Sequence, residues 1–557
     1  MTVSALPDDS VVVIASSRTV ITLPDDTLLL TPATITISPA TGKITSVVQE
    51  LLPRSSFPEA WVYHDYSPKL LLPGLVDAHV HLNEPGRTEW EGFNTGTKAA
   101  ASGGVTTVID MPLNAIPPTT TLAGFRKKLA ASRGQCWIDV GFYGGVVPGN
   151  AAELLPLAEA GVRGFKGFLI DSGVEEFPAV SSKDIALAMT TLKDEPTTLM
   201  FHAEMVPPPD AVPAGGTLSD AVQQSEPPAR PAGELDSYST FLESRPPAFE
   251  TCAVGEILSL AHLAPRLHLH IVHLSAAECI PLLREARRRG VNVTAETCFH
   301  YLGFAADDIP DGDTRHKCCP PIRSQTNQLG LWREIADPAG CIQTVVSDHS
   351  PCTPELKLLP PHLQTEFQDG PRPPMQHADS GIDVSPPEDE KREEEQEEMK
   401  QAEVETASLT ADEARPAKTQ GDFFAAWGGI SSVGLGLPIL HTAAAAAAAD
   451  GALSVVDIVR LCSQATAKQV GLAHRKGGIR AGMDADLCVF DDADVWTLRA
   501  ADMRWKNRCS PWEGHTFRGR VHETWLRGRK VFQLGGENGG FVGGQPIGEA
   551  IVERRTA

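Results

Sequence analysis

The sequence predicts an α/β protein, a (β/α)₈ barrel of the TIM type with a small β-sandwich domain formed from both chain ends. Through the middle of the chain, apolar segments typical of buried strands alternate with helical segments. Both ends, residues 1–72 and 475–535, contain short β-rich runs separated by Pro, Gly and Asp turns. A chain of 557 residues is long enough for one large domain and one smaller one.

Because both chain ends are β-rich, they are expected to pair into one small sheet domain. At the N-terminal end the expected strands are residues 11–15, 33–37 and 43–48, and at the C-terminal end they are residues 485–490 and 524–532. Residues 536–557 are expected to form a C-terminal tail.

Residues 73–474 are expected to form the barrel. Eight candidate strands lie in this region: 75–81, 104–111, 136–144, 162–168, 197–203, 267–274, 290–297 and 341–348. One intervening helix, 281–289, has proline in its first turn and stops at Gly290, and a last helix, 454–470, begins after Ser454 as N-cap. An open doubly wound sheet is the alternative arrangement for such a pattern.

Two segments do not fit a compact barrel. Residues 206–234 contain many Pro, Ala and Gly residues and are expected to form an extended surface loop. Residues 360–420 include a strongly acidic run and few aromatic or β-branched residues. Such a composition cannot bury enough apolar surface to offset the entropy of ordering, so a disordered acidic insertion is expected there.

The overall composition excludes several classes of protein. Hydrophobic residues make up 42% of the chain and charged residues 21%, which is typical of soluble globular proteins. The net charge of -23 argues against nucleic acid as a partner. No apolar stretch is long enough to span a bilayer and the N-terminus lacks signal-peptide features, so a cytoplasmic location without membrane contact is expected. The 11 cysteines lack the regular spacing of a disulfide framework.

The strongest local signal is the pair His79 and His81 at the end of the first barrel strand. Alternation along a strand places both side chains on one face, about 7 Å apart, so both imidazoles can reach a common metal ion. Taken alone, a His-x-His pair is more often two packed histidines at a strand end. The polar, sharply turned loop that follows at 83–87 is typical of an active-site loop.

Three further polar residues close apolar strands: His202, His273 and Asp348. In a barrel the C-terminal ends of all strands converge on the face that carries the active site. Any one of these histidines could be a hydrogen-bonded core residue, but their shared position is hard to explain by packing. The other histidines near these elements are interpreted as structural or as supports of the ligands: His262, His268, His270, His300, His316 and His349.

Lys166 lies inside the apolar strand 162–168. A lysine there is normally a snorkelling side chain or a neutralised amine, and its ammonium form cannot bind a metal. A neutral amine that reacted with carbon dioxide would give a carbamate with two oxygens, able to bridge two cations. From the lysine alone the structural interpretation is the stronger one.

The motifs around these residues resemble the cyclic amidohydrolase group of the amidohydrolase superfamily, and within it the allantoinases. The resemblance covers nearly the whole chain apart from the proline-rich loop and the acidic insertion. The matching motifs are 73–87, 103–114, 164–168, 201–204, 271–275, 296–302, 320–323, 347–351 and 427–432.

The resemblance implies a centre with two divalent metal ions. It implies that His79, His81 and Asp348 bind one ion, that His202 and His273 bind the other, and that a carboxylated Lys166 bridges them. Zinc suits these ligands, although cobalt, manganese or iron could also bind. Asp348 is then also the catalytic residue that carries a proton. The family further implies a small ureide substrate and a homo-oligomer, expected to be a tetramer.

Substrate choice rests on fewer residues. Dihydroorotases usually carry arginine at the position of Asn83, which suits a carboxylate substrate, so asparagine favours a neutral ring. Asn114 is a second candidate for binding the ureide. Dihydropyrimidinases have a tyrosine shortly after the bridging lysine, which is lacking in 167–171. Phe299 replaces a common proline. A hydantoinase-type enzyme and a non-catalytic scaffold remain as alternatives.

Overall fold

A computed structural model describes residues 11–58, 61–208, 233–364, 419–446 and 453–556. Each of the eight predicted barrel strands has a counterpart that overlaps its expected segment, and one short additional strand, β9, is present. Their bounds are β6 (Leu75–Val80), β7 (Val105–Asp110), β8 (Asp139–Phe142), β9 (Gly144–Gly145), β10 (Phe165–Phe168), β11 (Thr198–His202), β12 (His268–Ile271), β13 (Val293–Cys298) and β14 (Ile342–Val346).

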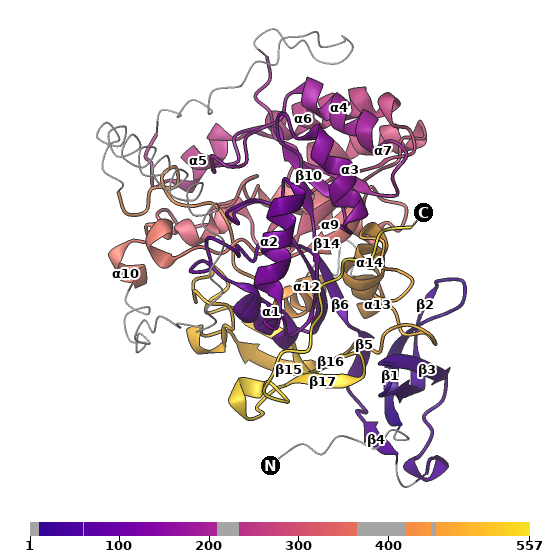
Figure 1. Cartoon of the computed structure of the whole chain (residues 1–557). Coiled ribbons are helices and arrows are strands. Elements are labelled where there is room, and N and C mark those ends of the chain that lie inside the picture. The colour runs from indigo at the N-terminus through magenta and orange to yellow at the C-terminus, as the bar shows by residue number, and fades with distance from the viewer. Residues whose placement is uncertain (1–10, 59–60, 209–232, 365–418, 447–452, 557) are drawn as a thin grey trace, which may run out of the picture.

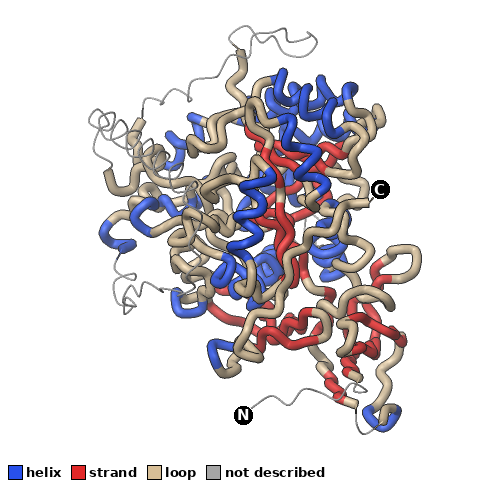
Figure 2. Tube along the Cα trace, in the orientation of Figure 1, coloured by secondary structure: helices blue, strands red, loops and turns tan. Residues whose placement is uncertain are grey.

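The barrel strands form two parallel arcs in chain order, β6-β7-β8 and β9-β10-β11-β12-β13-β14. Strands lie in the centre of the barrel region, with helices outside them (Figure 2). Residues 139–145 connect the two arcs: β8 belongs to the first arc, β9 to the second, and Tyr143 lies between them. At the other seam, Val80 forms a parallel bridge with His349, and the His81 N–H donates to the His349 carbonyl at 2.8 Å. The order is that of a (β/α)₈ barrel, with hydrogen bonding interrupted at the seams.

Helices follow most of the strands and cover the outside of the barrel (Figure 1). Several begin where a Ser or Thr side chain accepts a hydrogen bond from a first-turn N–H, as at Thr121, Ser181, Ser324 and Ser454. Their bounds are α1 (Phe93–Ser102), α2 (Leu122–Ser132), α3 (Ala151–Glu159), α4 (Ser182–Leu192), α5 (Tyr238–Ser244), α6 (Pro247–Leu260), α7 (Ile280–Arg288), α8 (Phe299–Gly303), α9 (Gln325–Ala336), α10 (Pro361–Gln364), α12 (Gly436–Ala446), α13 (Val455–Val459) and α14 (Ala465–Gln469).

The two helices expected from local signals are present. Helix α7 has a proline in its first turn, and Gly290 follows it with φ +87°. Gly290 therefore belongs to the turn after the helix, and strand β13 begins later than expected. The predicted helix 454–470 consists of α13 and α14 joined by a π-helical turn at 460–464, with Ser454 in a capping box.

Both chain ends contribute to one eight-stranded sheet of order β17-β16-β15-β5-β1-β2-β3, in which β4 also pairs with β1. Strands β15 and β5 join the two ends in antiparallel register, with Leu487 opposite Pro73. The bounds are β1 (Val12–Thr22), β2 (Leu28–Ser38), β3 (Lys43–Val48), β4 (Val62–Asp65), β5 (Leu70–Pro73), β15 (Leu487–Thr497), β16 (Thr516–Leu526) and β17 (Arg529–Gln533).

The two faces of this sheet pack into different cores. Leu71, Leu487 and Val489 belong to a small separate core, whereas their neighbours Leu70 and Cys488 pack into the core of the barrel. This division follows from the alternation of side chains along a strand. The sheet is therefore covered on both faces and is fixed to the barrel.

The expected strand 524–532 is wrong in one respect, because it is a hairpin of two strands. Arg527 and Gly528, with φ +46° and +71°, form the turn between β16 and β17. Both turn residues adopt the left-handed conformation of a two-residue hairpin turn. Arginine is uncommon there, which explains why the sequence pattern did not reveal the turn.

A buried ionic cluster connects the sheet to the barrel. The Lys476 Nζ lies 2.6 Å from Asp139 of β8, 2.6 Å from Asp486 and 3.1 Å from Asp484, and its side chain is fully buried. Arg527 also pairs with Asp139. The ammonium group occupies the space between three carboxylates that could otherwise bind a metal ion.

The C-terminal residues pack against the barrel rather than extending away from it. Ala550 forms a bridge with Val140 of β8, and Ile551 is buried. The buried Arg163 donates from Nε to the Val470 carbonyl at 3.0 Å, and Arg555 donates to the Arg163 carbonyl at 2.6 Å. These contacts fix most of the expected tail, 536–557, on the barrel surface.

Some expectations fall on parts of the chain that are not described. Residues 209–232 of the proline-rich loop and residues 365–418 of the acidic insertion lie outside the described residues. In the described part of the chain, no helix combines the length and apolar character needed to cross a bilayer. All 11 cysteines lie in described segments and none forms a disulfide, as predicted.

Candidate active site

The six predicted ligands lie at the C-terminal ends of barrel strands. His79 is in β6, with His81 directly after that strand, and Lys166 is in β10. His202 is the last residue of β11, while His273 and Asp348 lie two residues beyond β12 and β14. All six are buried. Parallel strands bring these ends to one face of the barrel, so residues far apart in sequence become neighbours.

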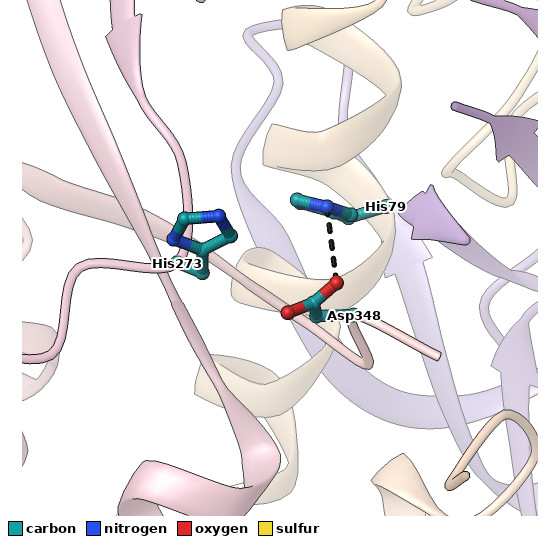
Figure 3. A group of neighbouring side chains, drawn as sticks. All are labelled: His79, His273 and Asp348. Carbon is teal, nitrogen blue, oxygen red and sulfur yellow. Dashed lines mark ion pairs between the residues drawn. The ribbon is translucent and has the colours of Figure 1, made fainter. Parts of the chain in front are cut away.

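Three of the six residues form one compact group of ligand atoms. Atoms of His79, His273 and Asp348 lie within 4.8 Å of one another and could hold a metal ion. Figure 3 shows these side chains facing a common space, with the His79 Nε2 3.1 Å from Asp348 Oδ1. The His81 Nε2 lies 3.5 Å from the same oxygen, and the Lys166 Nζ lies 3.2 Å from His79 Nε2.

His202 and His273 form the other half of the group. The His202 Nδ1 lies 3.1 Å from His273 Nε2, and the two rings meet edge to face with centroids 4.6 Å apart. Phe168 stacks on His202 at 4.6 Å. The Nδ1 of His273 is buried without a hydrogen-bond partner among the described residues. Two imidazole nitrogens that face each other at this distance are suited to share a cation.

A buried carboxylate, Glu296 of β13, orients the first of these histidines. Its Oε1 lies 2.5 Å from His79 Nδ1 and accepts from the His273 N–H at 3.3 Å, while Oε2 lies 3.1 Å from His270 Nε2. With Nδ1 engaged by the carboxylate, the Nε2 of His79 is directed at Asp348. Metal-binding histidines are commonly oriented by such a carboxylate.

Glu204 has the same role for His202. Its Oε2 lies 2.8 Å from His202 Nε2 and accepts from Arg245 Nη1 at 2.6 Å. The sequence motifs contain both Glu204 and Glu296, but sequence reasoning gave neither of them a role. Glu296 could have been identified as a carboxylate inside an apolar strand, and Glu204 as a carboxylate two residues after a histidine at a strand end.

We expect Glu296→Gln to lower the affinity of the site for divalent metal about 10–100-fold, because glutamine cannot hold His79 and His270 with a full negative charge. Equilibrium dialysis against graded concentrations of a chelator, with metal content measured afterwards, checks this result. Glu278→Gln, a change at an exposed glutamate, is the control. Equal metal retention in both variants would contradict the orienting role.

Burial and charge set the protonation of the ligands. Burial lowers the pKa of His81 to about 3 and of Lys166 to about 8, and it also lowers the pKa of His202 and His273. Burial alone would raise the pKa of Asp348, but His79 and His81 hold it well below its usual range. Near neutral pH His81, His202 and His273 are therefore neutral imidazoles and Asp348 is a carboxylate, which are the forms that bind metals.

His79 differs from the other histidines. Burial and Lys166 oppose its charged form, yet Asp348 and Glu296 together raise its pKa above the ordinary value. The two carboxylates thus make this position attractive for positive charge.

Several site residues have an unusual backbone conformation. Among the described non-glycine residues with positive φ are Asn83 at +60°, Asn114 at +66°, His273 at +37° and Asp348 at +44°. Such conformations are costly for residues other than glycine, and they concentrate at functional sites. At His273 and Asp348 the turn ends the strand and directs the side chain into the site.

A cavity of about 400 Å³ opens onto these residues. Its floor includes His81, Lys166, His202, His273 and Asp348. One wall is formed by residues 424–429, which directly follow the undescribed part of the acidic insertion. The family motif 427–432 overlaps this wall, but sequence reasoning gave it no place beside the strand ends.

Two buried lysines hold this wall in place. Lys317 donates to the carbonyl of Phe424 at 3.0 Å and to that of Ala426, and Lys357 donates to the carbonyl of Trp427 at 3.1 Å and to that of Gly429. The Trp427 ring also meets Trp90 edge to face at 4.6 Å. The wall is therefore anchored to the barrel by charge-assisted hydrogen bonds and aromatic packing.

The two asparagines proposed for substrate binding have different positions. Asn114 lines the cavity, with its Nδ2 3.4 Å from His81 Nδ1. Asn83 is buried and donates to the Pro351 carbonyl at 3.4 Å, and it is not among the residues that line the cavity. Phe299 begins α8 and packs against Gly436, where an added Cβ would lie 2.2 Å from its ring.

Most of the remaining histidines support the structure. His268 and His270 share the hydroxyl of Thr294, and the His349 Nδ1 accepts from the N–H groups of Ser432 and Val433. His316 lies beside Asp313, and His262 contacts the Ser259 carbonyl. His300 is different, because neither ring nitrogen has a partner among the described residues.

Known proteins resemble this chain over most of its length. The amidohydrolase family matches the chain over residues 70–212 and again over 438–532. An allantoinase of Saccharomyces cerevisiae is 44% identical over 531 residues, which cover 94% of this chain and 96% of that protein. The chain belongs to the allantoinase family. An allantoinase of Streptomyces avermitilis is 38% identical over 90% of this chain and 92% of that protein.

The allantoinase-family chain shares its fold with solved structures of other amidohydrolases. The L-hydantoinase (dihydropyrimidinase) from Arthrobacter aurescens superposes with a TM-score of 0.73 and covers 97% of this chain and 99% of its own. The sequence identity is 23%, so this likeness concerns the fold alone. It agrees with the barrel and terminal sheet described above.

Proposed function

We propose that this protein hydrolyses the ring amide of allantoin to give allantoate. The observation that carries the proposal is the convergence of His81, His202, His273, Lys166 and Asp348 at one cavity, with His79 3.1 Å from Asp348, in a chain that belongs to the allantoinase family. A cavity of about 400 Å³ is of the size that small-molecule sites have.

The donor atoms fit two divalent cations, for which we propose zinc. His79, His81 and Asp348 would hold one ion, and His202 and His273 the other. The support is chemical: facing imidazole nitrogens 3.1 Å apart, a buried Nδ1 of His273 without a partner, and a carboxylate shared by two histidines.

Lys166 would bridge the two ions as a carbamate. Its lowered pKa leaves part of the amine neutral near physiological pH, and only the neutral amine attacks carbon dioxide. The Nζ–C bond forms and one proton leaves the nitrogen for solvent, so the product carries a negative charge. That negative charge would suit a position between two cations, whereas an ammonium group would repel them.

When bound, the two ions would lower the pKa of a water molecule and polarise the substrate carbonyl. Asp348 lies at the cavity floor, with its Oδ1 near both His79 and His81. It would accept the proton of the attacking water and return it to the departing ring nitrogen. Its depressed pKa keeps it ionised before the reaction, as a proton acceptor must be.

Substrate preference would depend on the cavity walls. Asn114 lines the cavity and offers an amide to the ureide tail of allantoin. Asn83 lies outside the cavity lining, and it would favour a neutral substrate only by supplying no charge for a carboxylate. The alternative is a hydantoinase-type activity, favoured by the fold likeness alone. Against it, Ile170 and Asp171 line the cavity shortly after Lys166, where dihydropyrimidinases carry a tyrosine.

A substrate panel with metal analysis tests the proposal. We expect purified protein to open allantoin far faster than hydantoin or dihydrouracil, to contain two ions per chain, and to lose activity on chelation and regain it with zinc. Faster opening of hydantoin or dihydrouracil would overturn the substrate assignment. Absence of both activity and bound metal would instead favour a non-catalytic scaffold.

We further propose a cytoplasmic homotetramer. The support is family resemblance and composition. We also propose domain limits from the family resemblance and the composition. Residues 1–72 and 475–535 form the terminal domain, residues 73–474 the barrel and residues 536–557 the tail. Size-exclusion chromatography with light scattering tests the assembly.

A further inference from the structure

A second group of ligand atoms lies beside the proposed metal centre. Atoms of Cys298, His300 and Asp348 lie within 4.8 Å of one another. Cys298 is the last residue of β13 and His300 is in α8, and their exposed fractions are 0% and 1%. Only Asp348 belongs to both groups.

His300 has no other role that accounts for its polarity. Both ring nitrogens are buried without a hydrogen-bond partner among the described residues. A buried polar group without a partner destabilises the folded state. The ring meets Tyr301 edge to face at 4.3 Å, which satisfies neither nitrogen. A cation that accepts the ring lone pair would give one of the two nitrogens a partner.

The three side chains together have the chemistry of a zinc site. Thiolate, imidazole and carboxylate are the ligands that zinc takes, and the sulfur favours zinc or cadmium over magnesium or calcium. Asp348 lines the open cavity, so a cation that reaches the cavity reaches the first of the three ligands.

We propose that Cys298, His300 and Asp348 form an additional site for a soft divalent cation, distinct from the pair of catalytic ions. On binding, the S–H bond of Cys298 breaks, the proton goes to solvent and a sulfur–metal bond forms. His300 donates a ring lone pair and Asp348 a carboxylate oxygen. No oxidant or other reactant is needed.

Occupation of this site would inhibit the enzyme. Asp348 holds one catalytic ion and carries the proton in the proposed function, and a cation beside Cys298 would draw its carboxylate away from both tasks. Excess zinc or cadmium is therefore inhibitory although zinc is required. This consequence rests on the proposed function, whereas binding of the cation does not.

Cadmium alone, added to the metal-loaded protein, is the probe. None of the six catalytic ligands contains sulfur, so the ultraviolet charge-transfer absorption of a cadmium–thiolate bond reports only on cysteines. We expect the wild type to show this absorption and to bind one more cadmium ion than Cys298→Ser. His300→Asn should keep the absorption but weaken cadmium binding at least about tenfold, because one of the three ligands is lost.

Cys318→Ser is the matched control. Cys318 is buried like Cys298 and lines the cavity, but it does not belong to the ligand group. It should titrate like the wild type. Loss of the absorption in Cys318→Ser, or its persistence in Cys298→Ser, would overturn the site. If Cys298→Ser fails to fold by circular dichroism, His300→Asn decides, and unchanged cadmium affinity there overturns the proposal.

The outcomes also separate this site from the proposed function. If cadmium binding depends on Cys298 but the protein does not open allantoin, the proposed function is contradicted and the cation site is supported. Allantoin hydrolysis with cadmium binding independent of Cys298 and His300 would do the reverse.

Discussion

Lys166→Ala is expected to lose both metal ions and at least about 10³-fold in kcat/KM for allantoin. The proposed carbamate is the only ligand that belongs to both ions, and metal stabilisation of a transition state contributes several kcal/mol, with 1.36 kcal/mol for each tenfold change in rate. Elemental analysis of the purified variant beside steady-state kinetics checks both parts of the prediction.

A short carboxylic acid such as propionate should partly restore metal and activity to Lys166→Ala, since it can occupy the space of the missing bridge. Lys183→Ala, an exposed lysine on α4, is the control and should retain two ions. Unchanged metal content in Lys166→Ala would contradict the bridge, whatever the activity.

Lys476→Met is expected to lower the free energy of unfolding by about 3–5 kcal/mol. Removing the central cation leaves the buried Asp486 without its ammonium partner, and leaves Asp139 and Asp484 with only Arg527, Arg475 and Lys43 beside them. Breaking a buried ion pair from one side has costs of this size. Chemical denaturation followed by tryptophan fluorescence measures the change.

Lys43→Ala is the matched control for this cluster. The Lys43 Nζ lies 2.5 Å from Asp484, but its side chain is 38% exposed, so water can replace it. An exposed pair contributes at most about 1 kcal/mol. Equal destabilisation by Lys43→Ala and Lys476→Met would show that burial of the central ammonium is not what stabilises the cluster.

The sequence predicted the barrel strands and the convergence of the four histidines and Asp348, because both depend on local patterns, whereas Lys166 became a candidate only through the family resemblance. An apolar run that ends in a polar residue is visible without knowledge of the fold, and parallel strands bring such ends together. The carboxylates Glu204 and Glu296 escaped notice because their roles depend on which histidine nitrogen they face, and only tertiary geometry determines that.

Other features depend on contacts that no local pattern encodes. The cavity wall at 424–429 is held by Lys317 and Lys357, which are distant in sequence and pair with backbone carbonyls that any residue carries. The hairpin at Arg527 was concealed because arginine occupies a conformation usually left to glycine or asparagine. The unsatisfied ring of His300 cannot be recognised before its surroundings are known.

The cavity wall has a consequence for the acidic insertion. The chain leaves the described structure at Gln364 and re-enters at Thr419, and the two flanks are joined directly: Gly421 donates to the Leu358 carbonyl at 2.6 Å, and Trp427 donates to that of Leu356 at 2.8 Å. The two flanks are hydrogen-bonded to each other, so the entropy cost of closing the loop between them changes only slowly with the number of residues in the loop. Shortening the segment 365–418, or replacing it with another sequence, should therefore leave catalysis intact.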